Sequence, residues 1–141
     1  MKVLLDTNVL VAAFISRGQC NELLEHCVRN HELVTSPTIL DELERVLREK
    51  LDFPRAMVAE ALELVRGEAT EFDPPGLPEP VSRDPDDDEV LAAAFEGECD
   101  VIVTGDDDLL TIESYRDITI LTPSRFWEHD LQSFEGEDDT G

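Results

Sequence analysis

The feature that most constrains the fold is a series of short apolar runs that alternate with longer segments of helical spacing. The runs predict strands at Lys2–Leu5, Glu32–Thr35, Ala69–Phe72 (an edge strand), Asp100–Val103 and Ile118–Leu121. Helices are predicted at Thr7–Ile15, Cys20–Arg29, Pro37–Lys50, Pro54–Gly67, Asp84–Glu96 and from Pro123 to about Leu131. Such alternation is typical of right-handed βαβ units. We therefore predict an α/β fold with a central, mainly parallel sheet of four or five strands, covered on both faces.

The length of 141 residues and a hydrophobic content of 41% fit one domain with a proper core. We place this domain at residues 1–134, followed by an acidic tail over residues 135–141 that we expect to be disordered. No apolar run approaches the roughly 20 residues of a membrane-spanning helix, and no export signal is visible. We therefore expect a cytoplasmic protein.

The charge balance restricts the partners that the chain can bind. Its 34 acidic and 11 basic residues give a formal net charge of −23, and only Lys2 and Lys50 are lysines. Such a chain should repel a polyanion at low ionic strength. It either binds a basic partner or works in molar salt, where the Debye length is only ~3 Å. Because the acids are spread through all segments, we favour a salt-adapted (halophilic) cytoplasm.

The cysteines and histidines show no spacing typical of a zinc site or a catalytic pair. These residues are Cys20, Cys27, Cys99, His26, His31 and His129. We therefore expect free, buried thiols and histidines with a surface or core role.

Two acids come at or shortly after the ends of predicted strands. Asp6 follows Lys2–Leu5, and Asp106 comes shortly after Asp100–Val103. Each could be a simple helix cap or turn residue. However, the carboxyl ends of parallel strands meet at one edge, where α/β proteins bind their ligands, and neighbouring strands are only ~4.8 Å apart. We therefore predict that the two carboxylates share a cation.

Two further acids are placed by helical periodicity, at about 100° per residue. Glu42 lies beside Ile39 and Val46 at the border of an apolar stripe, where a carboxylate needs either a metal or an ion pair such as one with Arg45. Both alternatives stay open.

The run from Asp84 to Glu89 contains the fourth candidate. With Asp84 as N-cap, Asp87 occupies the capping-box position, whereas Asp88 shares a stripe with Leu91 and Phe95. We therefore choose Asp88 for the site and Asp87 second. Four converging carboxylates raise each other's pKa values, and a divalent cation relieves this; oxygen ligands favour Mg²⁺ or Mn²⁺.

These motifs together resemble the PIN domain family. The match rests on Asp6-Thr7-Asn8-Val9-Leu10, Glu42 within its helix, Asp84-Pro85-Asp86-Asp87-Asp88 and Val103-Thr104-Gly105-Asp106, in that order. It extends from Lys2 to about Trp127 and is closest to the toxins of toxin–antitoxin systems (VapC-like ribonucleases).

The resemblance implies a three-layer α/β/α sandwich and Mg²⁺- or Mn²⁺-dependent cleavage of single-stranded RNA by a metal-activated water. It implies that Asp6, Glu42, Asp88 and Asp106 are both the metal ligands and the catalytic residues. Further implications are supporting hydrogen bonds from Thr7, Asn8 and Thr104, a small antitoxin partner and a homodimer. The chain departs from the family in its acidic surface and in Asp107 and Asp108, which with Asp87 leave the composition of the site open.

Two alternatives remain. One is a catalytically silent PIN-like binding or regulatory module, against which the four intact acids argue. The other is a phosphotransfer enzyme with Asp6 as nucleophile, such as a haloacid-dehalogenase-like phosphatase or a receiver domain. The first of these patterns wants an aspartate where Asn8 stands, and the second needs a lysine nearer the site than Lys2 or Lys50.

Overall fold

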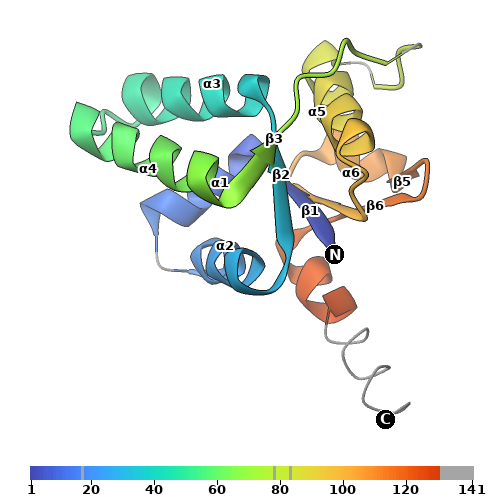
Figure 1. Cartoon of the computed structure of the whole chain (residues 1–141), viewed down its shortest axis with the longest axis horizontal. Coiled ribbons are helices and arrows are strands. Elements are labelled where there is room, and N and C mark those ends of the chain that lie inside the picture. Colours follow the sequence, from blue (N-terminus) through green and yellow to red (C-terminus); the bar gives the residue numbers. More distant parts are fainter. Residues whose placement is uncertain (17, 78, 83, 131–141) are drawn as a thin grey trace.

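The computed structural model describes residues 1–16, 18–77, 79–82 and 84–130, and in these the strands form one sheet in the order β3-β2-β1-β4-β6-β5 (Figure 1). The strands are β1 (Lys2–Leu5), β2 (Glu32–Thr35), β3 (Ala69–Glu71), β4 (Val101–Val103), β5 (Ser114–Tyr115) and β6 (Ile118–Leu121). All neighbouring strands are parallel except β5 and β6. Ala69–Glu71 is an edge strand, as predicted.

The helices lie at nearly all the predicted positions. They are α1 (Thr7–Ile15), α2 (Gln19–Asn30), α3 (Pro37–Arg45) with a π-helical turn η1 (Val46–Lys50), α4 (Arg55–Glu68), α5 (Pro85–Glu96) and α6 (Asp107–Ile112). A C-terminal helix starts at residue 123 and continues to residue 130. The predicted end of this helix at Leu131, the domain boundary at residue 134 and the tail over 135–141 lie outside the described residues.

The sheet is the middle layer of a three-layer sandwich. α1 to α4 lie on one side of it, and α5 and α6 lie on the other (Figure 1). This follows from the right-handed crossover rule, because the chain moves from β1 to β3 in one direction along the sheet and from β4 to β6 in the other. Leu4, Leu40, Leu91, Ile102 and Phe126 are among the fully buried side chains of the core. The predicted α/β/α fold is confirmed.

Three helices begin where a capping side chain precedes a proline. Ser36 accepts a hydrogen bond from the Ile39 amide (3.2 Å), Asp84 from the Asp86 amide (2.9 Å) and Thr122 from the Arg125 amide (3.2 Å). These bonds satisfy amide groups that the helices themselves leave unpaired. Capping therefore fixes the starts of α3, α5 and the C-terminal helix.

In the described residues the sheet has six strands, whereas four or five were predicted. The additional strand, β5, pairs antiparallel with β6 through a turn at Arg116 and Asp117, both with positive φ (45° and 69°). α6 is likewise absent from the predicted helices. Both elements are short. α6 follows β4 in the chain, and β5 is the edge strand next to β6.

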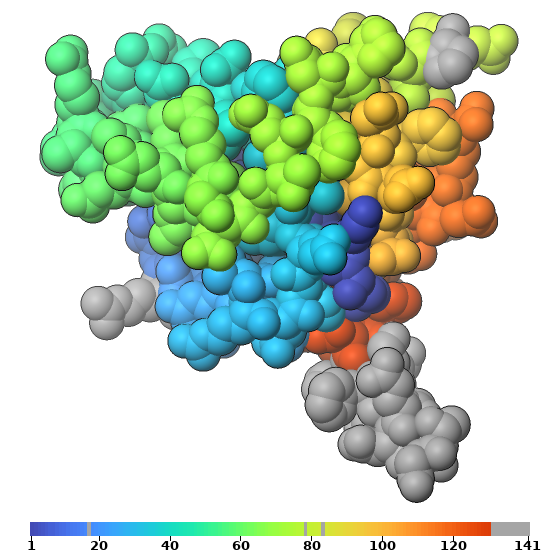
Figure 2. Space-filling view, in the orientation of Figure 1, coloured from blue at the N-terminus to red at the C-terminus, as the bar shows by residue number. Residues whose placement is uncertain are grey.

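The segment after β3 crosses over to α5. Figure 2 shows this light-green segment lying between the green surface of α4 and the yellow surface of α5. The Phe72 amide extends the pairing of β2 by donating to Thr35 (2.9 Å). Among the described residues, no helix combines the length and the apolar character needed to cross a membrane.

Candidate active site

The carboxyl ends of β1 and β4 lie side by side where the order of the sheet reverses. Leu5 pairs with Val103, and the Asp6 amide donates to the Val103 carbonyl oxygen (3.0 Å). Asp6 follows β1 directly, and residues 104–106 follow β4. The sheet therefore brings these two segments together at the edge where ligands of α/β proteins bind.

Asp6 is buried (7% exposed) and is held by three hydrogen bonds. Its Oδ1 accepts from the Thr7 amide (2.8 Å), and its Oδ2 accepts from Thr104 Oγ1 (2.8 Å) and Asn8 Nδ2 (3.0 Å). Burial raises the pKa of Asp6 above its usual value, while the bonds from Thr104 and Thr7 act in the opposite direction. Asp6 thus caps α1, and its carboxylate is fixed in one orientation.

The Thr104 and Asn8 side chains connect Asp6 to Asp106. Thr104 Oγ1 accepts from the Asp106 amide (3.0 Å), and Asn8 Oδ1 accepts from the Gly105 amide (2.8 Å). A side chain at Gly105 would bring its Cβ to 3.2 Å from Asn8 Oδ1, so a glycine suits this approach. Asp106 caps α6 by accepting from the Asp108 amide (3.1 Å). The two acids are therefore parts of one hydrogen-bonded unit.

Glu42 extends from α3 at the rim of the same site. Its side chain is 42% exposed, and its Oε1 lies 3.7 Å from Arg45 Nη2. Partial burial and the charge of Asp6 raise the pKa of Glu42, and Arg45 counteracts them. Glu42 therefore has the ion-pair partner Arg45, and it also lines the cavity formed by the acidic residues of this site.

The structure places Asp87, and not Asp88, in this site. Asp87 is 5% exposed and lines the cavity, where its Oδ2 accepts from Ser82 Oγ (3.1 Å). Asp88 instead accepts hydrogen bonds from the backbone amides of Val81 and Ser82 (3.2 and 2.8 Å). The expectation that Asp88 faces the site is therefore wrong. Asp87 makes no reciprocal capping box, and Asp88 holds the loop before α5.

The cavity between these segments has a volume of about 350 Å³ and is strongly acidic. Among the described residues, its lining includes six carboxylates and no basic side chain. The six are Asp6, Glu42, Asp84, Asp86, Asp87 and Asp106. Val11, Val46 and Val90 supply apolar walls, and Thr7 and Asn8 complete the lining. A cavity of this kind attracts cations and repels anions.

Asp87 has the most strongly perturbed carboxyl of the site. Burial, a hydrogen bond shared with Asp106 and the charge of Asp106 raise its pKa to about 7. Asp87, Asp106 and Asp108 each place one carboxylate oxygen within 4.8 Å of the other two. Of the acids whose membership the sequence left open, Asp87 and Asp108 thus lie close to Asp106, whereas Asp107 is exposed.

Sequence comparison connects the chain to a single domain family. The sequence model of the PIN domain matches residues 2–108, which include all the acids of the cavity. No curated protein matches the chain.

Several solved structures are similar to this chain, among them the following two. The first is VapBC2 from Rickettsia felis bound to a DNA fragment from their promoter, with a TM-score of 0.59 and 14% identity over 85% of this chain and 97% of that chain. The second is FitAcB from Neisseria gonorrhoeae, with a TM-score of 0.52 and 17% identity over 86% of this chain and 97% of that chain. At these identities the similarity concerns the fold.

Proposed function

Because this chain belongs to the PIN domain family, we propose that it is a Mg²⁺- or Mn²⁺-dependent endoribonuclease that cleaves single-stranded RNA. The observation that supports this most is the cavity itself, where six carboxylates from separate segments converge and none of the described lining residues is basic. Such an arrangement is costly unless protons or cations neutralise it. Nuclease chemistry uses cations held in this way.

The residues of the cavity fit a divalent cation of the hard, oxygen-preferring kind. All the candidate ligands are carboxylate oxygens, which suit Mg²⁺ and Mn²⁺ better than zinc. Thr7 Oγ1 is also buried at the cavity without a hydrogen-bond partner among the described residues. We propose Asp6, Glu42, Asp87 and Asp106 as the ligands, with Asp87 in place of Asp88.

The protein side of the mechanism follows from the contacts of these residues. A bound divalent cation would stabilise charge on the phosphate and lower the pKa of a water molecule. Thr104 and Asn8 orient the Asp6 carboxylate, and Asp88 anchors the loop that carries Ser82, which in turn bonds Asp87. A cation held between Asp87 and Asp106 would replace the proton that the raised pKa of Asp87 keeps there, and that proton would pass to solvent.

We further propose that the protein is a cytoplasmic toxin that pairs with a small antitoxin and forms a homodimer. The resemblance of the motifs to toxin-type PIN domains and the similarity to VapBC2 and FitAcB support this assignment. Expression of the wild-type chain should then arrest growth of a host cell, whereas Asp6→Asn should not. A mass measurement in molar KCl tests the dimer.

The deciding experiment is cleavage of a fluorescent single-stranded RNA in ~2 M KCl with Mn²⁺ or Mg²⁺. We expect cutting that EDTA abolishes and that Asp6→Asn reduces by more than about 100-fold, since even residues that only orient metal ligands contribute 10- to 100-fold. Asp41→Asn is the matched control, because Asp41 is an exposed acid next to Glu42. A folded, metal-binding protein that cuts no RNA would instead support the silent binding module.

A further inference from the structure

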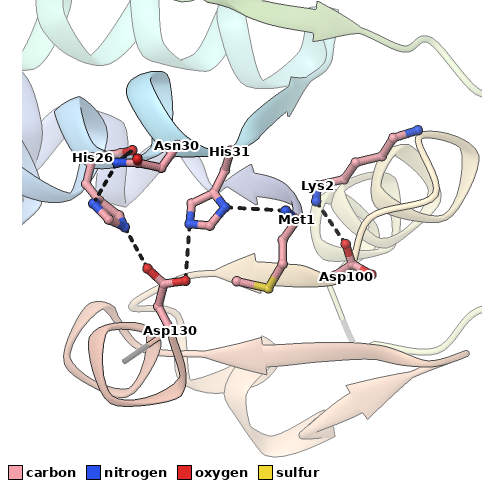
Figure 3. Close-up of polar contacts among 7 residues, drawn as sticks. All are labelled: Met1, Lys2, His26, Asn30, His31, Asp100 and Asp130. Carbon is pink, nitrogen blue, oxygen red and sulfur yellow. Dashed lines mark hydrogen bonds and ion pairs between the residues drawn. The ribbon is translucent and has the colours of Figure 1, made fainter. Parts of the chain in front are cut away.

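A second group of ligand-type side chains lies at the opposite end of the sheet from the acidic cavity. His26 belongs to α2, His31 directly precedes β2, and Asp130 belongs to the C-terminal helix (Figure 3). Sequence spacing does not connect them, because His31 and Asp130 lie near opposite ends of the chain. The structure adds that His26 and His31 share Asp130 as a partner.

The carboxylate of Asp130 lies between the two imidazole rings. Its Oδ2 is 2.6 Å from His26 Nε2, and its Oδ1 is 3.3 Å from His31 Nε2, as Figure 3 shows. The three candidate ligand atoms all lie within 4.8 Å of one another. Neighbouring ligands of a tetrahedral zinc ion lie about 3.4 Å apart, given bonds of about 2.1 Å. The distance between His31 Nε2 and Asp130 Oδ1 is close to this value, whereas His26 Nε2 and Asp130 Oδ2 are at hydrogen-bonding distance and would move apart around an ion.

One of the two imidazoles is not satisfied by this arrangement. The His31 side chain is only 9% exposed, and its Nε2 is buried without a properly aligned hydrogen bond despite its closeness to Asp130. An imidazole nitrogen buried in this way normally has a partner. Its Nε2 is directed at Asp130, the carboxylate that His26 also contacts.

We infer that His26, His31 and Asp130 form a binding site for a transition-metal ion of the zinc type, separate from the acidic cavity. Two imidazoles and a carboxylate are a donor set that zinc favours and that magnesium does not. Each neutral imidazole would bind the ion through its Nε2 lone pair and keep its ring proton on Nδ1, and a ring protonated on both nitrogens would first release its Nε2 proton to solvent.

The surroundings of the three residues agree with this assignment. The amino group of Met1 lies 3.4 Å from His31 Nδ1, on the side of the ring away from Asp130. The side-chain amide nitrogen of Asn30 lies 3.1 Å from His26 Nδ1 and also donates to the His26 carbonyl oxygen (3.1 Å), which holds the His26 ring in position. An open hollow lined by Met1, Arg29 and His31, among others, lies beside the group.

The bound ion would fasten the C-terminal helix to the rest of the domain. The same helix already packs Trp127 against His26 (4.7 Å between ring centroids) and Phe126 against His31 (5.9 Å). An ion bound by Asp130, His26 and His31 would add a polar crosslink between the C-terminal helix and two residues that precede β2. Its main effect is therefore on stability rather than on the acidic cavity.

The test is a zinc titration of the whole chain against a chromophoric chelator, in excess Mg²⁺ to occupy the oxygen-rich cavity. We expect one tightly bound Zn²⁺ and a higher melting temperature, because a ligand specific for the folded state stabilises it. His26→Gln, His31→Gln and Asp130→Asn should each weaken binding by at least about 100-fold. His129→Gln, a histidine next to Asp130 that is not part of the group, should bind as the wild type does.

The histidine NMR resonances of the wild-type chain give a second readout that needs no variant. Zinc should shift the ring signals of His26 and His31 and leave those of His129 in place. The proposal is overturned if no zinc binds in excess Mg²⁺, if the three variants bind as tightly as the wild type, or if zinc leaves the signals of His26 and His31 unchanged.

Discussion

Asp87 and Asp88 are neighbours in the chain, but only the side chain of Asp87 lines the acidic cavity. The sequence favours Asp88 because it shares a stripe with Leu91 and Phe95, two large apolar residues that are expected to face the core. In the structure Phe95 is 46% exposed and lies beneath the Arg116 guanidinium (5.2 Å to the ring centroid). The buried stripe is instead formed by Val90, Leu91 and Ala94, at i+3, i+4 and i+7 from Asp87. The sequence signal for this buried face is the run of small residues from Ala92 to Ala94, all of which are buried.

The two aspartates should respond to neutralisation with opposite signs in the metal-free protein. Asp87→Asn removes a carboxyl that burial and Asp106 disfavour, so we expect stabilisation on the order of 1–2 kcal/mol at pH 8. Asp88→Asn weakens the acceptor for the Val81 and Ser82 amides, so we expect a loss of about 1 kcal/mol. Urea unfolding in EDTA measures both changes. Equal effects from the two variants would contradict the placement of Asp87 in the cavity.

The pH dependence of the metal-free protein follows from the same carboxyl. The pKa of Asp87 is raised to about 7, so the folded chain keeps a proton that the unfolded chain releases above about pH 4. Its contribution is therefore fully present below about pH 4 and is lost as pH rises through 7. The difference in stability between Asp87→Asn and the wild type should grow from pH 4 to pH 7 and then level off. Urea titrations across this range test it, and a difference independent of pH would contradict it.

At the scale of elements, caps and apolar runs carried enough information to predict the parallel strands and the long helices. Ser36, Asp84 and Thr122 each cap a helix and are each followed by a proline, a pattern typical of helix starts. β5 and α6 could not be predicted in this way, since β5 has two residues and its turn places Arg116 and Asp117 at positive φ without a glycine. Short elements of this kind depend on contacts with β6 rather than on local sequence.

The end of α5 gives a test of how closely the layers approach each other. A Cβ at Gly97 would lie 2.9 Å from Val34 Cγ1 and 3.1 Å from Phe72 Cε2. Gly97→Ala should therefore destabilise the protein by about 1–3 kcal/mol through overpacking. Gly67→Ala is the matched control, because nothing lies within 4 Å of its Cβ position and alanine favours helix α4 by up to about 1 kcal/mol. Thermal melting separates the two, and a neutral Gly97→Ala would contradict the close approach.

For the whole molecule, the formal net charge of −23 is the property that composition predicts most directly. Exposed acids occur on α3, α4 and α5, as in Asp41, Glu60 and Glu89, and therefore on both helical layers. A single basic partner would cover one face only. Screening by salt acts on all faces, so the distribution favours adaptation to high salt. An RNA is itself a polyanion, so it should approach the acidic cavity only where salt screens the negative charge of the protein.

The salt dependence of stability tests this interpretation. Self-repulsion should weaken as the Debye length falls from ~10 Å at 0.1 M salt to ~3 Å at 1 M, and a gain of about 2 kcal/mol would raise the melting temperature by roughly 5–8 °C. Because KCl can also strengthen apolar burial, the wild-type curve alone is ambiguous. Glu60→Lys with Glu63→Lys changes two exposed positions of α4 and makes the net charge less negative by four, from −23 to −19. This double variant should melt higher than the wild type at 0.1 M KCl and gain less at 2 M. If both proteins gain equally, self-repulsion is not what salt relieves.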